Sequence, residues 1–140
     1  MADVAEAMGV AKGTVYFCVE SKEALFDVAL RYADAPRPIV APPILPVRAP
    51  APGRTLRYVR DRLAGAPASP TLSNALSHAR MEADAEGLTR IVRELYQVMA
   101  MNRTGIKLVD RCAAEYPELA KVWFSEGRGV LLTQLTRCLD

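Results

Sequence analysis

The side chains of this sequence with the most evident chemistry lie close together near its start. Over residues 12–19 they occupy one predicted helix: Lys12, Gly13, Thr14, Tyr16 and Phe17. If Val15 points inward, a rotation of about 100° per residue turns Gly13 and Phe17 outward, with the other three on the flanks. Such a face suits the major groove of DNA, where its groups reach phosphates, base edges and thymine methyl groups. The alternative is a helical hairpin within a core, with Phe17 buried under a neighbour.

Neighbouring helices are needed to hold this face in place. Ala5 is small enough to lie where a first short helix crosses the second, and Gly9 permits the positive φ of the turn between them. The side chains expected to point inward or to close a small core are Val4, Met8, Val10, Ala11, Val15, Cys18 and Val19.

A third helix is predicted to follow directly. Ser21 is a good N-cap, and Glu23 in the first turn suits the positive end of the helix dipole. Lys22 then lies at a helix N-terminus, where its ammonium and the free backbone N–H groups can hold one phosphate together.

Four short sequence motifs follow one another at fixed spacings, and their combination is specific enough to indicate a family. They are Val4-Ala5, Met8-Gly9-Val10, Lys12-Gly13-Thr14-Val15-Tyr16 and Ser21-Lys22-Glu23-Ala24-Leu25-Phe26. Through them, residues 2–30 resemble the DNA-binding domain of the TetR/AcrR transcriptional regulators. The resemblance implies a recognition helix over residues 12–19. It also implies that the matching positions contact DNA, with Lys22 on a phosphate: Lys12, Gly13, Thr14, Tyr16, Phe17 and Lys22.

Regulators of this family are typically homodimers on palindromic double-stranded operators, and they leave DNA when a small molecule enters their C-terminal helical domain. The resemblance therefore predicts a sequence-specific DNA-binding regulator, a repressor, released by a small hydrophobic effector. Two positions depart from the family pattern. Ala11 replaces a capping hydroxyl, at a cost of about 1 kcal/mol, and Val19 replaces a common phenylalanine.

A larger departure concerns the ends of the chain. The family has a further helix before its helix-turn-helix and further helices that build the dimer interface, and neither is found before Met1 or after Asp140. We therefore expect a fragment, a misassigned start or a degenerate copy.

Charge favours a different interpretation. Residues 1–35 contain three basic and six acidic side chains, a net charge of −3, and the remainder carries +5. Phosphate neutralisation supplies most non-specific DNA affinity, so an acidic reader is unusual. The alternative function is a helical small-molecule-binding or protein-interaction module that has lost DNA binding with its first helix.

Composition divides the chain into three parts and predicts an all-α fold. Residues 1–35 form the partial helix-turn-helix domain. Residues 36–53 hold seven prolines and predict an extended linker, a spacer rather than a partner-docking site. Residues 54–140 predict a helical regulatory domain. Four helices are expected in this domain. The first is capped by Thr55, the second runs from Leu72 to Ala79, the third is one long helix over 87–116, and the fourth runs from Pro117 to Leu139.

Five side chains of this second domain are candidates for effector binding: Tyr96, Met99, Asn102, Trp123 and Gln134. The aromatic and methionine side chains would line an apolar pocket, and the amides would supply polar contacts. The alternative is ordinary core packing and amides bonded to backbone or neighbouring helices. His78 is the only histidine and a weak candidate for a pH switch.

Other function classes have little support in the sequence. No apolar run is long enough to cross a bilayer, and no secretory signal opens the chain. The three distant cysteines, Cys18, Cys112 and Cys138, predict reduced thiols in a cytoplasmic protein rather than a disulfide framework or a metal site. One histidine and no recognisable carboxylate cluster predict neither catalysis nor a cofactor.

Overall fold

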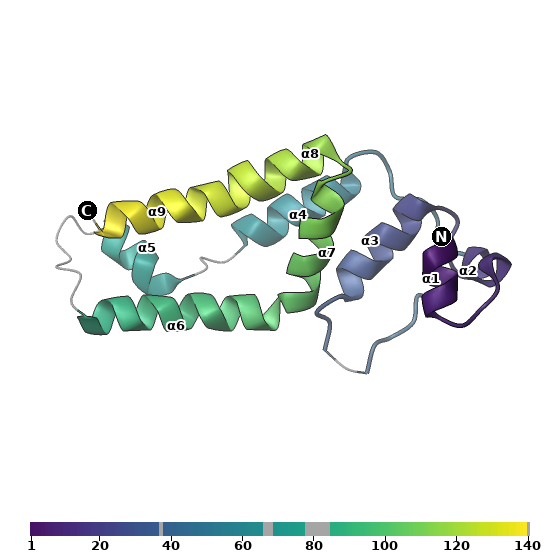
Figure 1. Ribbon diagram of the computed structural model, residues 1–140, viewed down its shortest axis with the longest axis horizontal. Helices are drawn as coiled ribbons and strands as arrows, with labels where there is room; N and C mark the ends of the chain where they lie inside the picture. The colour runs from purple at the N-terminus through teal and green to yellow at the C-terminus, as the bar shows by residue number, and fades with distance from the viewer. Residues whose placement is uncertain (37, 66–68, 78–84, 140) are drawn as a thin grey trace. The chain divides into compact units, whose positions relative to one another are not determined.

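The chain has an all-α fold in a computed structural model that describes residues 1–36, 38–65, 69–77 and 85–139 (Figure 1). It divides into two compact units, Met1–Thr55 and Leu56–Asp140. His78 and Ala79 lie outside the described residues.

The first unit begins with three short helices, α1 (Ala2–Ala7), α2 (Lys12–Cys18) and α3 (Lys22–Tyr32), as the sequence predicts. Gly9 makes the turn between α1 and α2 with φ of 66°. Ser21 caps α3, because its hydroxyl oxygen accepts a hydrogen bond from the Ala24 amide at 3.2 Å. Local chemistry therefore separates α1 from α2 at Gly9 and starts α3 at Ser21, whereas the N-caps of α1 and α2, Met1 and Ala11, form no side-chain capping hydrogen bond.

The core of this unit differs in part from the predicted one. One buried cluster consists of Ala5, Val15, Val19 and Ala24, with Met1, Val10, Leu25 and Val47 packed against it. Met8, Ala11 and Cys18 are exposed, contrary to the prediction that they point inward. The prediction from helical periodicity that Cys18 points inward is wrong, because α2 ends at this residue. Val19 is already extended, with φ of −139° and ψ of 138°, and its side chain is buried.

The proline-rich stretch is more than a spacer, which corrects the prediction for 36–53. Val47 forms a parallel bridge with Val19. The Val47 amide donates to the Cys18 carbonyl at 2.8 Å, and the Glu20 amide donates to the Val47 carbonyl at 2.9 Å. We call residues 47–49 the return segment. It pairs because Val47, unlike the prolines around it, keeps a backbone donor.

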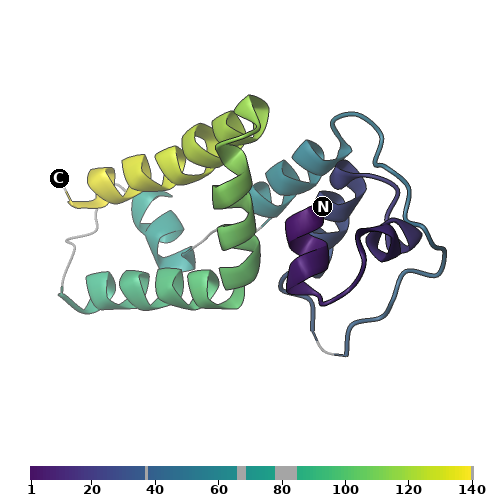
Figure 2. The ribbon, with the colours of Figure 1, turned by 45° about the vertical axis from the view of Figure 1, so that its right-hand side comes forward.

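Helix α4 (Arg54–Ala64) has its first two residues in the first unit and the remainder in the second. The second unit also holds α5 (Pro70–Ser77), α6 (Ala85–Met101) and α7 (Arg103–Ala113). One continuous helix then contains α8 (Pro117–Ala120), the π-helical stretch η1 (Lys121–Gly129) and α9 (Val130–Leu139). Pro117 opens it at the first turn, as predicted. Helix α5 contacts both α6 and α9, between which it lies (Figures 1 and 2).

The prediction of one long helix over 87–116 is wrong, because the helix is interrupted at Asn102, which separates α6 from α7. Asn102 has φ of −108° and ψ of 21°, outside the helical range. Its side-chain amide donates to the Val98 carbonyl at 2.9 Å, in competition with the helical backbone pattern. Helix α7 consequently runs across the end of α6 (Figures 1 and 2).

A partly buried polar cluster links α5 to α6. Ser69, only 2% exposed, caps α5 by accepting from the Leu72 amide at 3.0 Å, and its hydroxyl donates to Glu94. Thr71 donates to the same carboxylate through its hydroxyl at 2.7 Å and its amide at 3.1 Å. The hydrogen bonds from Ser69 and Thr71 lower the pKa of Glu94, so this carboxylate is charged when it ties the two helices together.

Candidate nucleic-acid interface

Helix α2 has one buried and one exposed face. Val15 is 4% exposed and anchors the helix in the core of the first unit. Phe17 is 77% exposed and Tyr16 is 44% exposed. The alternative prediction, in which a neighbour buries Phe17, is therefore not what the first unit shows.

The centre of this exposed face is open. A Cβ atom built on Gly13 would meet no heavy atom within 4 Å, so the backbone there is accessible to a close partner. Lys12 and Thr14 are exposed on either side. One short helix thus brings five of the six predicted DNA contacts onto one surface: Lys12, Gly13, Thr14, Tyr16 and Phe17.

Lys22, the sixth, is exposed at the first position of α3. The Ser21 hydroxyl already satisfies the Ala24 amide there. The pKa of Glu23 is lowered, first by its backbone hydrogen bond and then by the one with Ser21, so Glu23 stays charged at this helix terminus. Any phosphate at Lys22 would share the terminus with this carboxylate.

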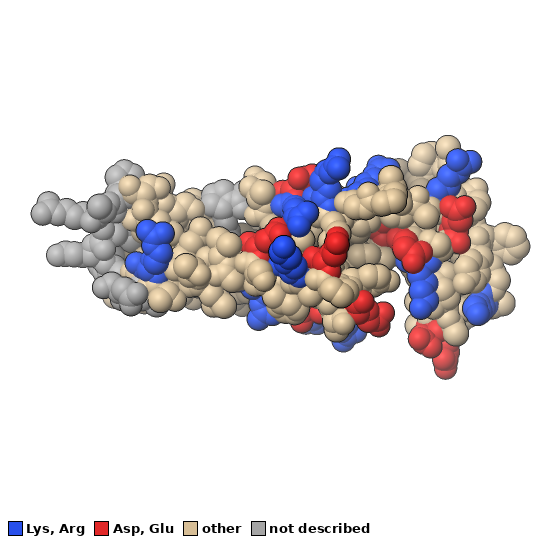
Figure 3. Space-filling model, turned by 90° about the horizontal axis from the view of Figure 1, so that it is seen from above, with Lys and Arg blue, Asp and Glu red and all other residues tan. Residues whose placement is uncertain are grey.

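The charge of the first unit is balanced rather than acidic. Residues 1–35 carry −3, but residues 36–55 add three arginines and no acidic residue, which gives the folded unit six basic and six acidic side chains. On the face shown in Figure 3, both signs are interspersed over this unit, at the right of the view. Sequence reasoning missed this balance because it ended the domain at residue 35.

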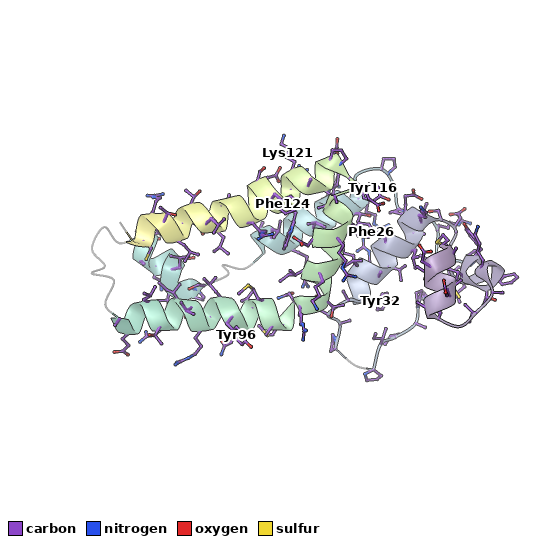
Figure 4. The ribbon with its side chains drawn as sticks, in the orientation of Figure 1. Phe26, Tyr32, Tyr96, Tyr116, Lys121 and Phe124 are labelled. Atoms are coloured by element: carbon purple, nitrogen blue, oxygen red, sulfur yellow. The ribbon has the colours of Figure 1, made fainter. Side chains whose placement is uncertain are left out.

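The five residues predicted to bind an effector do not lie on one surface, in contrast to the predicted DNA contacts of α2. Tyr96 and Met99 are 69% and 54% exposed on α6, and neither is enclosed (Figure 4 labels Tyr96). Trp123 is buried in η1, where its indole N–H donates to Asp110 at 2.9 Å. Gln134 is half-buried on α9.

Asn102 follows the alternative prediction for a buried amide. It donates to the Val98 carbonyl and accepts from Arg62, so neighbouring groups satisfy both ends of its side chain. The five candidates are spread over α6, the α6–α7 break, η1 and α9. A pocket that joins them stays a prediction.

Comparisons with known proteins add no relative: no family model, curated protein or solved structure matches the chain. Within the described ranges, no group of three or more His, Cys, Asp or Glu side chains is placed to hold a metal ion. No helix among the residues described is both long and apolar enough to span a membrane.

Proposed function

We propose that this protein is a sequence-specific DNA-binding transcriptional regulator whose α1 and α2 act as a helix-turn-helix, with α2 as the recognition helix. The observation that carries the proposal is the two-faced character of α2. Val15 fixes the helix in a core, and Lys12, Tyr16 and Phe17 stand exposed around the open backbone of Gly13.

The chemistry of each group fits a major groove. The Lys12 ammonium and the Tyr16 hydroxyl reach phosphates or base edges, and Thr14 suits either. Phe17 offers an apolar ring to a thymine methyl group. Lys22 contributes a further phosphate contact from the start of α3.

The resemblance of residues 2–30 to TetR/AcrR regulators extends the proposal. In this scheme the protein is a cytoplasmic homodimer on a palindromic operator, and it acts as a repressor. The helical second unit takes up a small hydrophobic effector that releases the DNA. Support for these points is the resemblance together with the all-helical character of the unit that follows.

The test begins with selection of duplexes from a random pool by the full chain at low salt, followed by affinity measurements on the enriched sequence. Lys12→Ala and Tyr16→Ala are expected to weaken binding about ten-fold or more, the range of a lost base-edge contact. Lys107→Ala and Tyr116→Ala are matched controls, since both are exposed residues of the second unit outside the candidate binding residues and should leave affinity unchanged. Failure to enrich any duplex, or equal losses in the controls, would contradict the proposal.

The first unit carries no net positive charge to neutralise phosphates, which favours a second candidate, a helical binding module that no longer reads DNA. It predicts no duplex affinity even at low salt. It also predicts retained self-association, or uptake of a hydrophobic dye by the second unit. Salt-dependent operator binding by the 140-residue chain would exclude this candidate.

A further inference from the structure

The return segment, residues 47–49, lies against the end of α2 just past the exposed recognition face. It is held from both sides of Val19: the Val47 amide bonds the Cys18 carbonyl at 2.8 Å, and the Val47 carbonyl accepts from the Glu20 amide at 2.9 Å. Two residues on, the Ala49 amide donates to the Glu20 carboxylate at 3.0 Å. These bonds fix the position of the intervening residue, Arg48.

Arg48 is exposed, whereas its neighbour Val47 is half-buried and packs against the core cluster. Successive side chains of an extended chain point to opposite sides, so the inward position of Val47 turns Arg48 away from the core. The fold thus places the backbone of an exposed arginine beside Cys18 and Glu20. In the sequence, these two residues lie between the recognition face of α2 and Lys22 at the start of α3.

Charge makes this placement significant for an anionic partner. Glu20 is the acidic residue nearest in sequence to the recognition helix, and its carboxylate would repel a phosphate. The Ala49 amide donates to that carboxylate, and the residue before Ala49 in the same paired segment is the exposed Arg48. The return segment, which has one arginine and no acidic residue, is therefore paired with the chain on either side of Val19, next to Glu20.

We propose that Arg48 is a phosphate-binding residue of the DNA interface, held beside the end of α2 by the pairing of the return segment. The inference rests on the proposed DNA-binding function and adds a contact from outside the helix-turn-helix. An arginine is suited to this position because its planar donors bind phosphate oxygens in pairs.

The first test measures the affinity of the full chain for its enriched duplex across a salt series. Each phosphate contact contributes about 0.9 to the slope of log affinity against log salt. Arg48→Ala should lower the slope by about that amount and weaken binding about five- to ten-fold at 0.1 M salt. Arg48→Lys should keep the slope, and Arg93→Ala, which removes an exposed arginine of α6, should change neither quantity.

The second test concerns the pairing. Glu20→Gln and Glu20→Ala both remove the negative charge, but only glutamine keeps an oxygen that accepts from the Ala49 amide. We expect Glu20→Gln to bind the duplex about three-fold more tightly than Glu20→Ala. That gap should vanish when Arg48→Ala is added to both variants, because the pairing then has no guanidinium to position. If the difference in affinity between the two Glu20 variants persists without Arg48, the bond between Glu20 and Ala49 stabilises α2 alone. The proposal that it positions Arg48 would then be overturned.

The two proposals fail in different ways. If the unaltered chain binds a duplex and Arg48→Ala behaves like Arg93→Ala, the phosphate contact is overturned and the DNA-binding function stands. If the unaltered chain binds no duplex at any salt concentration, both are overturned.

Discussion

Gly9 and Gly13 lie close together in the sequence but have different backbone requirements. Gly9 has φ of 66°, a conformation that L side chains rarely adopt, and its surroundings are open. Gly13 lies within α2, where glycine has no conformational advantage and costs helix stability. The fold therefore does not require glycine at position 13, and the open space around it suits the close approach of a binding partner.

We predict that Gly13→Ala separates stability from binding. Alanine should raise the free energy of unfolding of the first unit by about 0.5–1 kcal/mol, because it is the better helix former. The same methyl group should weaken duplex binding, because it keeps a groove from approaching the backbone. Urea unfolding followed by circular dichroism and duplex titration check the two effects.

Gly9→Ala is the matched comparison. It should lower the free energy of unfolding by about 1 kcal/mol, because it forces a Cβ into the left-handed region. If Gly13→Ala instead destabilises the unit, or binds DNA as well as the unaltered chain, the assignment of Gly13 to the interface is wrong.

At the scale of elements, Asp27 ties α3 to the start of α4. Its carboxylate accepts two hydrogen bonds from Arg31, at 2.6 and 3.0 Å, and one from the Thr55 hydroxyl at 2.8 Å. The prediction that Thr55 caps α4 is wrong, because the helix begins at Arg54 and Thr55 lies inside its first turn. Burial by itself would raise the pKa of Asp27. The hydrogen bonds from Arg31 and Thr55, with the nearby positive charge, outweigh burial and lower the pKa.

The lowered pKa predicts an acid-sensitive first unit. A carboxyl with a lowered folded-state pKa contributes its stability above the unfolded pKa of about 3.9, and that contribution is lost as pH falls through the folded value. Asp27→Asn should cost about 1–3 kcal/mol at neutral pH, because it leaves Arg31 without its anionic partner. Below about pH 4 the variant and the unaltered chain should converge. Urea midpoints between pH 7 and pH 2.5 measure this difference, and a constant gap over the whole range would contradict the assignment.

At the scale of the whole molecule, the two compact units provide separate spectroscopic signals. Trp123, the single tryptophan, is buried in the second unit, so its fluorescence reports that unit alone. Circular dichroism reports the helices of both.

We predict that the two units respond to mutation separately. Ser69→Ala removes the buried cap of α5 and should lower the stability seen by Trp123 fluorescence by about 1–2 kcal/mol. Gly9→Ala should leave the fluorescence midpoint unchanged while it shifts part of the circular dichroism transition. Equal shifts by both probes for both variants would instead indicate one cooperative unit.

The signals that are local in sequence predicted much of this structure. The all-α class, the turn at Gly9, the cap at Ser21 and the helix start at Pro117 are confirmed, because backbone conformation and capping depend on a few adjacent residues. The outward position of Phe17 follows from helical periodicity in the same way.

Only the tertiary structure decided the rest, because it depends on residues far apart in the chain. No local pattern shows that Val47 pairs with Val19, since proline content alone predicts an extended chain and not its partner. The break at Asn102 depends on a side-chain hydrogen bond that competes with the helix and on Arg62, which comes from another helix. Helical periodicity places Ile91, Val92 and Met99 on one apolar face of α6, but the packing of neighbouring helices buried Ile91 and left the other two exposed.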